Sequence, residues 1–413
     1  MNRSTPLRLF IVLCFITHAV SADIHYSGHI KGLGNIWGYP QDSLYALQEG
    51  SSTAHANLDL RINLDGKLTE NPNFKWELAY QYLLAEQSQN VFSDTGIIND
   101  ERRLFDLTSK LHESADSYSV HRLDRFNLSY TSERWVLRAG RQALSWGSGI
   151  LFSVMDIVNP FDGRVYDQEY KVGDDILYLQ YLLDNGNDLQ FAEVFRRDPM
   201  TGQRGKAVNT RALKYHGFLN TLEYDLLFAE HYGEKVYALG FSGPLQEAVF
   251  HIELSQKNLA EEAYFSGLAG VNYSWVAFDK NWMGILEYFY DESGMGGEFS
   301  ASDIYTRTGL LESATRGERY FFGRSYLAAT TNIEQTPLLN LGATLFHNTG
   351  DQSSLLQVSA TYDWQQNLQV FAALALPFGS AGTEFTGIED DLSMPGYFLS
   401  YDYTAQARLA WYF

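Results

Sequence analysis

Charged side chains of both signs gather around one stretch of the chain. Arg138 and Arg141 precede a loop-like segment, and Asp156, Asp162 and Arg164 lie inside that segment. Fixed charges that line a narrow passage attract or repel charged solutes. If the segment folds back toward the two arginines, these five residues would form a constriction.

Two acidic pairs could supply carboxylate oxygens to calcium. They are Asp174-Asp175 and Asp390-Asp391. Neither pair has the spacing of an EF-hand loop, and paired acids in exposed loops are usually solvated. We therefore expect no metal and no cofactor.

The common catalytic signatures are missing from the sequence. It contains no H-E-x-x-H, no P-loop and no G-x-S-x-G. Ten histidines are present, but none lies in a short motif with Ser and with Asn or Asp. A lipid hydrolase built from distant Ser and His residues stays open, but we expect a protein that is not an enzyme.

The N-terminal residues have the three parts of a secretory signal peptide. Arg3 and Arg8 precede the apolar run 9–16, and a stretch of small residues follows at 19–22. We expect residues 1–22 to be removed, because the run is shorter than the roughly 20 residues of a membrane-spanning helix. Lipidation of Cys14 is an alternative, although no small residue directly precedes it. Cys14 is the only cysteine, so the mature chain would contain no disulfide.

Composition limits the class of protein. The formal charge is −20, and such an acidic surface repels nucleic acid. Aromatic residues make up 15% of the chain and prolines number only nine, which argues against disorder. No later segment is apolar enough for a membrane helix. An exported chain of this kind is periplasmic, secreted, or a closed β-barrel.

Apolar and polar residues alternate with a period of two in many segments, for example in 54–64, 74–84, 356–364 and 403–413. This period fits strands much better than helices. About 18 strands (16–18) are expected, at 24–37, 53–64, 73–84, 122–131, 134–141, 175–183, 188–197, 209–217, 220–230, 235–242, 245–255, 269–279, 282–291, 323–333, 338–347, 353–364, 367–377 and 401–413.

The connections between these segments alternate between tight turns and longer loops. Turns such as 132–133 and 365–366 alternate with long connections, notably 85–121, 142–174, 292–322 and 378–400. Short turns on one side, long loops on the other and both termini on the periplasmic side are typical of an antiparallel transmembrane β-barrel. We expect residues 23–413 to form one such domain. A soluble β-sandwich or propeller is the alternative, but tryptophans near strand ends favour the girdles of a membrane barrel.

Strand faces opposite the apolar ones would line the interior. They carry charges of both signs, at Asp59, Arg61, Lys75, Glu77, Arg125, Arg138 and Arg408. An Arg or Lys facing lipid at mid-membrane costs about 2–4 kcal/mol, so we expect a wet lumen. A salt-bridged lining that conducts nothing is the alternative.

The loop 142–174, after the fifth strand, is the expected constriction. Side chains such as Leu151, Phe152 and Met155 make it too apolar to extend into water. Asn159-Pro160 suits the start of a short helical turn. We expect the loop to fold into the barrel and to place its charged residues near Arg138 and Arg141. Alternatively, it only caps the wall.

A family resemblance appears at these residues. The stretch G-R-Q-x(3)-W-G-x-G-x(2)-F-x(3)-D-x-V-N-P-F-D begins at Gly140, and D-x-E-Y-K-x-G-D-D begins at Asp167. Together they resemble a segment of porin-like outer-membrane proteins of Gram-negative bacteria, in the style of alginate-export barrels. The specific resemblance covers about 138–197. It implies a transport barrel but no particular substrate.

We therefore expect a passive channel for small hydrophilic solutes in the bacterial outer membrane. The alternatives are an export conduit for an acidic polymer such as a polysaccharide, and a non-conducting surface or assembly barrel. Outer-membrane lipid and lipopolysaccharide would contact its exterior. The last strand, which ends at Phe413, would pair with 24–37 and bind the barrel-assembly machinery.

Overall fold

The computed structural model describes residues 24–86, 99–114, 117–259 and 262–413. The expected signal peptide lies outside these residues. Within them, no helix is both long and apolar enough to span a membrane.

Eighteen strands, in which apolar and polar residues alternate, form a closed antiparallel barrel. In ring order they are β1 (Ile24–Gly38), β2 (Ser52–Lys67), β3 (Phe74–Glu86), β5 (Ser117–Thr131), β6 (Trp135–Gln142), β7 (Asp174–Leu182), β8 (Asp188–Val194), β9 (Thr210–Leu219), β10 (Leu222–His231), β11 (Glu234–Leu245), β12 (Ala248–Leu259), β13 (Glu262–Ala277), β14 (Lys280–Asp291), β15 (Ser325–Thr336), β16 (Leu339–Asn348), β17 (Ser354–Gln365), β18 (Leu368–Phe378) and β21 (Tyr403–Tyr412). Each expected strand is present, which confirms the fold class.

The barrel closes between the first and last strands. β1 pairs with β21 from His29↔Tyr412 to Gly38↔Tyr403. The backbone N–H of Gly28 donates to Phe413 O at 2.9 Å, and that of Phe413 donates to Gly28 O at 3.1 Å. The chain therefore leaves no free edge between its first and last strands, as a membrane barrel requires.

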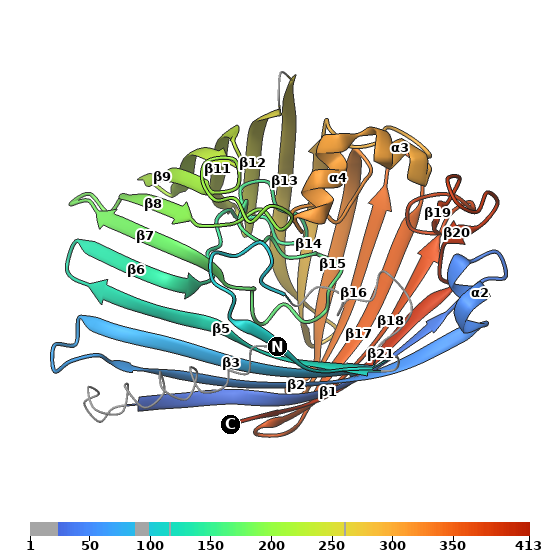
Figure 1. Cartoon of the computed structure of the whole chain (residues 1–413), viewed down its shortest axis with the longest axis horizontal. Coiled ribbons are helices and arrows are strands. Elements are labelled where there is room, and N and C mark those ends of the chain that lie inside the picture. The colour runs from blue at the N-terminus through green and yellow to red at the C-terminus, as the bar shows by residue number, and fades with distance from the viewer. Residues whose placement is uncertain (1–23, 87–98, 115–116, 260–261) are drawn as a thin grey trace.

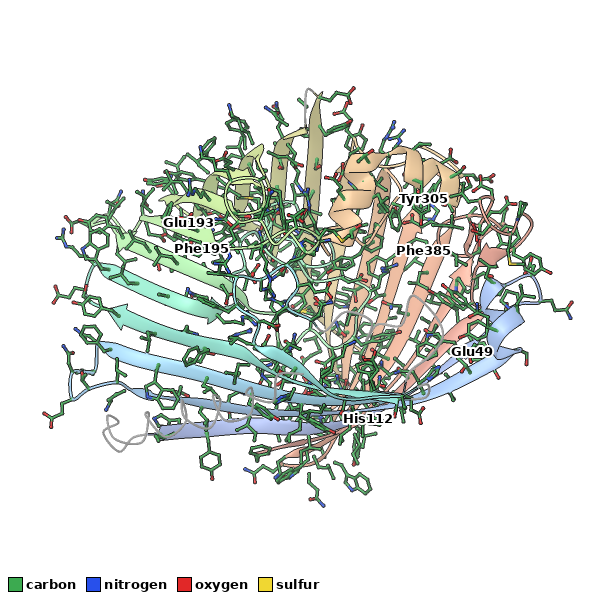
Figure 2. All side chains as sticks on the ribbon, in the orientation of Figure 1. Glu49, His112, Glu193, Phe195, Tyr305 and Phe385 are labelled. Atoms are coloured by element: carbon green, nitrogen blue, oxygen red, sulfur yellow. The ribbon has the colours of Figure 1, made fainter. Side chains whose placement is uncertain are left out.

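The outer surface carries the apolar side chains of the alternating pattern. Leu137, Leu226, Leu286 and Trp411 are each more than a third exposed, and Figure 2 shows side chains projecting outward along the wall. Aromatic pairs such as Trp135–Tyr181, with ring centroids 4.5 Å apart, lie near strand ends. This surface suits lipid contact.

A β-bulge in β5 changes which residues face inward. Ala79 of β3 pairs with Arg125, but the next residue, Tyr80, pairs with Leu123. Asp124 is the extra residue, so Asp124 and Arg125 both reach the interior. A bulge redirects a side chain in this way without breaking the strand.

The long-loop side contains elements that the alternation did not predict. β4 (Thr108–Glu113) pairs with β5 beyond the end of β6. Among the residues that the structure describes, the connections also contain three short helices, α2 (Leu44–Glu49), α3 (Ala301–Thr306) and α4 (Thr308–Thr315), and a small hairpin of β19 (Ile388–Glu389) and β20 (Phe398–Leu399). Figure 1 shows α3 and α4 over one rim of the barrel.

The sequence predicted a loop at 256–268, and this prediction is wrong. Residues 256–268 mostly continue as strands, because β12 runs to Leu259 and β13 starts at Glu262. Gln256 pairs with Phe265 and Lys257 with Tyr264. The hairpin continues past the level of the lipid-facing strands, where hydrogen-bonded backbone no longer needs the apolar alternation used to find strands.

A substitution at Gly28 tests the pairing of β1 with β21 that closes the barrel, called the closing seam below. A Cβ on Gly28 would lie 2.1 Å from Arg61 O and 2.7 Å from Cζ of Phe413, whereas a Cβ on Gly34 of the same strand would have no atom within 4 Å. We expect Gly28→Ala to destabilise the closed barrel by more than about 1 kcal/mol, because backbone or ring must move. Gly34→Ala is the matched control and should be neutral. Heat-induced unfolding in detergent measures both, and equal stability of the two variants would contradict this account of the seam.

Candidate functional site

A long loop between β6 and β7, residues 143–173, folds into the barrel and is called the inward loop below. In Figure 1 it runs as a teal trace inside the wall. Its expected inward course is confirmed by side-chain contacts to strands on opposite sides of the ring. The expected helical turn at Asn159-Pro160 is absent, and Asn159 has a φ of 49° instead.

Two buried glutamates, Glu253 of β12 and Glu287 of β14, hold the first half of the inward loop. Glu253 accepts backbone N–H groups from Ser148, from Gly149 at 2.9 Å, and from Val154 and Met155 at 3.0 Å. Glu287 accepts those of Ile150, Leu151 and Phe152 at 2.7–3.0 Å. Buried backbone donors need such partners, and hydrogen bonds to a charged acceptor are worth about 1.5–3 kcal/mol each.

Gly147 permits this close approach. It has a φ of 99°, and a Cβ would lie 2.6 Å from Oε1 of Glu253. His251 of β12 supports the second acceptor, since its Nε2 lies 2.9 Å from Oε1 of Glu287.

Apolar packing completes the first half. Leu144, Trp146, Met155, Ile157 and Val158 pack with buried residues of β7 to β11. Many of the wall residues are alanines, which leave room for the loop. Burial of a side chain such as Met155, which is fully buried, contributes about 1.5–3 kcal/mol.

An aromatic cluster lies farther along the same half. Phe152 stacks on Phe289 with ring centroids 5.0 Å apart. Leu151, Phe152 and Val154 share this cluster with Tyr326, Phe346 and Phe385, the last of which is labelled in Figure 2. The first half is therefore a fixed part of the inner wall over β7 to β16.

The second half is a smaller loop whose ends meet. Nζ of Lys171 donates to the carboxylate of Asp156 at 2.5–2.6 Å and to Leu144 O at 2.6 Å. Nδ2 of Asn159 lies 3.5 Å from Val172 O. Residues 160–170 therefore form a loop whose two ends lie next to each other.

This smaller loop reaches the far wall. Gln357 of β17 donates to Arg164 O at 2.8 Å, and the Tyr166 and Phe371 rings are 5.4 Å apart. Oδ2 of Asp167 lies 2.7 Å both from Nζ of Lys31 and from Nη1 of Arg408. A single loop carboxylate therefore contacts the first and last strands of the barrel.

Five basic side chains lie buried on the inner wall formed by β21, β1, β2, β3 and β5, next to this part of the loop. They are called the basic belt and comprise Lys31 of β1, Arg61 of β2, Arg122 and Arg125 of β5, and Arg408 of β21. All are buried, with exposed fractions of 2–9%. Asp124 contacts Arg61 at 2.9 Å, Arg125 at 2.6 Å and Arg122 at 3.6 Å, and Glu169 contacts Lys31 at 2.7 Å.

The expected lining residues fall into two groups. Lys75 and Glu77 are exposed on the inward face, and Asp59 and Arg138 are partly exposed. Arg61, Arg125 and Arg408 are buried instead in contacts with the loop or with Asp124. The ring of Tyr170 lies 4.0 Å from the Arg61 guanidinium. These three residues hold the loop in place and are covered by it.

The ion pairs of the inward loop differ from the expected ones. Asp156 pairs with Lys171, and Asp162 pairs with Arg164 at 2.8 Å. Arg141 is 2% exposed and contacts Asp100 at 2.8 Å and Asp175 at 3.0 Å. Arg141 is therefore a structural residue of the wall. Asp100 and Arg141 are 41 positions apart in the sequence, so no local pattern predicts this ion pair.

The expectation that Asp174 and Asp175 are solvated is also wrong. Both are 2% exposed, and Asp174 contacts Arg196 at 2.8 Å. Asp391 accepts hydrogen bonds from Ser300 and Ser302 at the start of α3. Among the described residues, no group of three or more acidic, His or Cys side chains could hold a metal ion.

Several residues that shape the site were missed from the sequence. Glu253 and Glu287 are single acids at inward positions between apolar neighbours, so the alternation could have identified them. Lys31, Lys171 and Asp167 carried no such signal, because the residues that they pair with are distant in the sequence.

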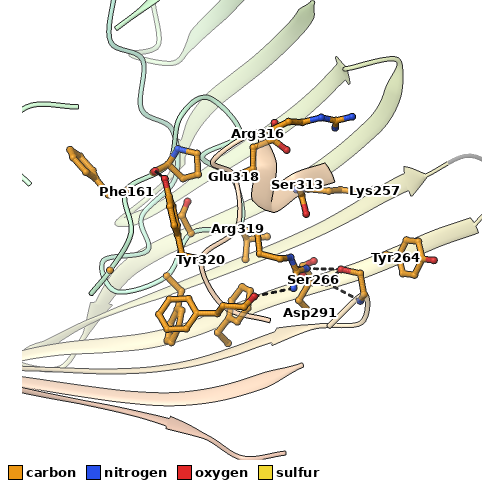
Figure 3. Close-up of a pocket in the computed structure, with 18 of the residues that line it drawn as sticks. Phe161, Lys257, Tyr264, Ser266, Asp291, Ser313, Arg316, Glu318, Arg319 and Tyr320 are labelled. Atoms are coloured by element: carbon orange, nitrogen blue, oxygen red, sulfur yellow. Dashed lines mark hydrogen bonds and ion pairs between the residues drawn. The ribbon is translucent and has the colours of Figure 1, made fainter. Parts of the chain in front are cut away.

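A cavity opens above the inward loop on the long-loop side. Phe161 and Tyr320 border it, together with Lys257 and Tyr264 of the β12–β13 hairpin and Arg316, which caps the end of α4 (Figure 3). Arg319 and Asp291 form an ion pair in its wall. Burial and nearby acidic groups raise the pKa of Tyr320 to about 12, so its hydroxyl stays a donor, here to Pro160 O at 3.1 Å. This cavity leads from the rim to the inward loop.

No family model matches the sequence, and no curated protein matches it. Solved structures resemble the fold. They include OccAB3 of Acinetobacter baumannii (10% identity, 95% of this chain and 100% of that chain, TM-score 0.52), a BenF-like porin from Pseudomonas fluorescens Pf-5 (9%, 95% and 98%, 0.54) and the outer membrane protein opdK from Pseudomonas aeruginosa (10%, 95% and 99%, 0.52). The chain therefore has the fold of bacterial outer-membrane porins. The resemblance over 138–197 stays a prediction.

Removing one acceptor tests how the inward loop is held. In Glu253→Gln, one carboxylate oxygen becomes an NH₂ group, which cannot accept the backbone N–H groups that point at it. We expect hydrogen-exchange protection of the amides of 148–155 to fall about 100-fold, equivalent to about 2.7 kcal/mol. Glu334→Gln is the control, because Glu334 accepts only from Asn281 among the described residues. Unchanged protection in Glu253→Gln would contradict the role of this carboxylate.

The Asp156–Lys171 contact makes loop docking depend on pH. Burial raises the pKa of Asp156 to about 6, and the Lys171 charge offsets this only in part. The docked state therefore binds a proton more tightly than the undocked state, whose pKa is near the ordinary value. Docking should weaken as pH rises through about 6 and strengthen below it. Hydrogen exchange of 157–172 between pH 5 and 7 measures this, after correction for the intrinsic rate. Asp156→Asn should abolish the dependence; a dependence that persists would assign it to another group.

Proposed function

We propose that this chain is a passive channel of the bacterial outer membrane for small hydrophilic solutes, and that the inward loop sets its width. The observation that carries the proposal is a closed 18-strand barrel whose inward loop is held at defined points around the wall. Barrels of this size enclose an aqueous space unless loops fill it. The loop narrows that space.

The polar inner surface supports passage of hydrophilic solutes. Below the inward loop, β15 to β17 present uncharged polar side chains to the interior, among them Thr330, Asn332, Asn340, Ser359 and Thr361. Charged side chains such as Lys75 and Glu77 lie on other strands at a similar distance from the short turns. Such a lining hydrates a channel without binding one ion strongly.

Export of an acidic polymer receives less support. A polyanion would need basic side chains that face the passage, but the basic belt is buried and already contacts carboxylates. A non-catalytic role fits the porin fold. Two contacts stay predictions: that of the outer wall with lipopolysaccharide, and that of the last strand, at Phe413, with the barrel-assembly machinery.

Single-channel conductance of the purified protein in planar bilayers tests the proposal. The informative variant replaces 160–170 by two glycines, because Asn159 and Val172 already lie together and the contacts to Glu253 and Glu287 are kept. We expect the wild type to conduct and the shortened variant to conduct more, since a segment that crosses the lumen is gone. A wild type without conductance would contradict the channel; equal conductance would contradict only the role of the loop.

A further inference from the structure

Resting on that proposed channel, we propose that Asp167 and Glu169 act as internal counter-ions of the basic belt and thereby make the lumen select cations over anions. The belt alone would favour anions. The loop covers it with carboxylates that belong to the same chain.

The geometry places these two carboxylates where an anion would bind. Nζ of Lys31 donates to Oδ2 of Asp167 and to Oε2 of Glu169, both at 2.7 Å. Arg408 contacts the same Asp167 oxygen at 2.7 Å. Lys31 is 2% exposed and Arg408 8% exposed, so neither is open to a solute while the loop is docked.

Asp167 is ionised at neutral pH. Burial by itself would raise its pKa, but the hydrogen bond and charge of Lys31, with the charge of Arg408, hold that pKa below its ordinary value. The carboxylate therefore supplies a full negative charge to the belt. The remaining members, Arg61, Arg122 and Arg125, contact Asp124 of the wall itself.

Nearer the short turns, acidic side chains outnumber basic ones on the inward faces of the described strands. The register places these carboxylates on inward faces there: Asp65, Glu77, Asp188, Glu223, Asp225, Glu334 and Asp363. The basic side chains at the same level are Lys67, Lys75, Arg138 and Lys214. Because opposite charges concentrate in a narrow aqueous passage, cations are favoured.

The test is the reversal potential of purified protein in planar bilayers across a KCl gradient. We expect the wild type to prefer potassium. A charge about 6 Å away in water changes the local concentration of a monovalent ion about three-fold, in opposite directions for potassium and chloride. Asp167→Asn should therefore lower the potassium-to-chloride permeability ratio by roughly three- to ten-fold, the smaller value applying where salt screens the charge. Glu169→Gln should do the same and, because its side chain is 35% exposed, should disturb folding less.

Two further variants separate charge from loop position. Lys31→Met combined with Asp167→Asn removes one charge of each sign and should restore most of the wild-type ratio. Gln357→Leu removes the hydrogen bond to Arg164 O without changing any charge. It should leave the ratio unchanged, even if conductance changes.

The outcomes distinguish this inference from the channel proposal. Conductance with an unaltered ratio in both Asp167→Asn and Glu169→Gln would overturn the counter-ion role alone. A shift in Gln357→Leu as large as that in Asp167→Asn would also overturn it, because displacement of the loop would then explain the result. A wild type that does not conduct would overturn both.

Discussion

The interior of this barrel depends on two carboxylates buried in its wall. Seven backbone N–H groups between Ser148 and Met155 point at Glu253 and Glu287. A loop without regular secondary structure pairs few of its own backbone groups, and unpaired donors in a dry environment are costly. The acceptors must therefore come from the strands. Because four backbone donors meet Glu253 and three meet Glu287, the cost of burying these charges is offset, and the loop takes one course along the wall.

The rest of the inward loop follows from that fixed start. Its first half packs on the small residues of β7 to β11, and its second half begins and ends at the Asp156–Lys171 contact. Between Asp156 and Lys171, the loop extends far enough for Asp167 to contact Lys31 and Arg408 on the two strands that close the barrel. Asp167 contacts both residues at once because β1 and β21 pair with each other, so closure of the ring and docking of the loop support one another.

Much of the fold follows from local pattern. A period of two located all eighteen strands, because each strand must present apolar side chains to one side and polar ones to the other along its whole length. The pattern failed where that constraint ends. β4 and the outer part of the β12–β13 hairpin lie beyond the lipid-facing zone, and the short helices occupy connections whose structure is set by capping and tertiary contacts, as with Asp391 at Ser302.

The sequence by itself determined the strands, the closing pair and the inward direction of residues such as Lys75 and Glu77, because alternation along a strand is a property of neighbouring residues. It also indicated that the apolar loop 142–174 would leave the solvent. Only the tertiary structure decided which charges face water. Arg61, Arg125 and Arg408 stand on inward faces as expected, yet they are covered, because their partners approach from a loop or from a bulged strand. Ion pairs such as Lys31–Asp167 join residues more than a hundred positions apart, and no local pattern encodes which of many acids a basic group will meet across a lumen.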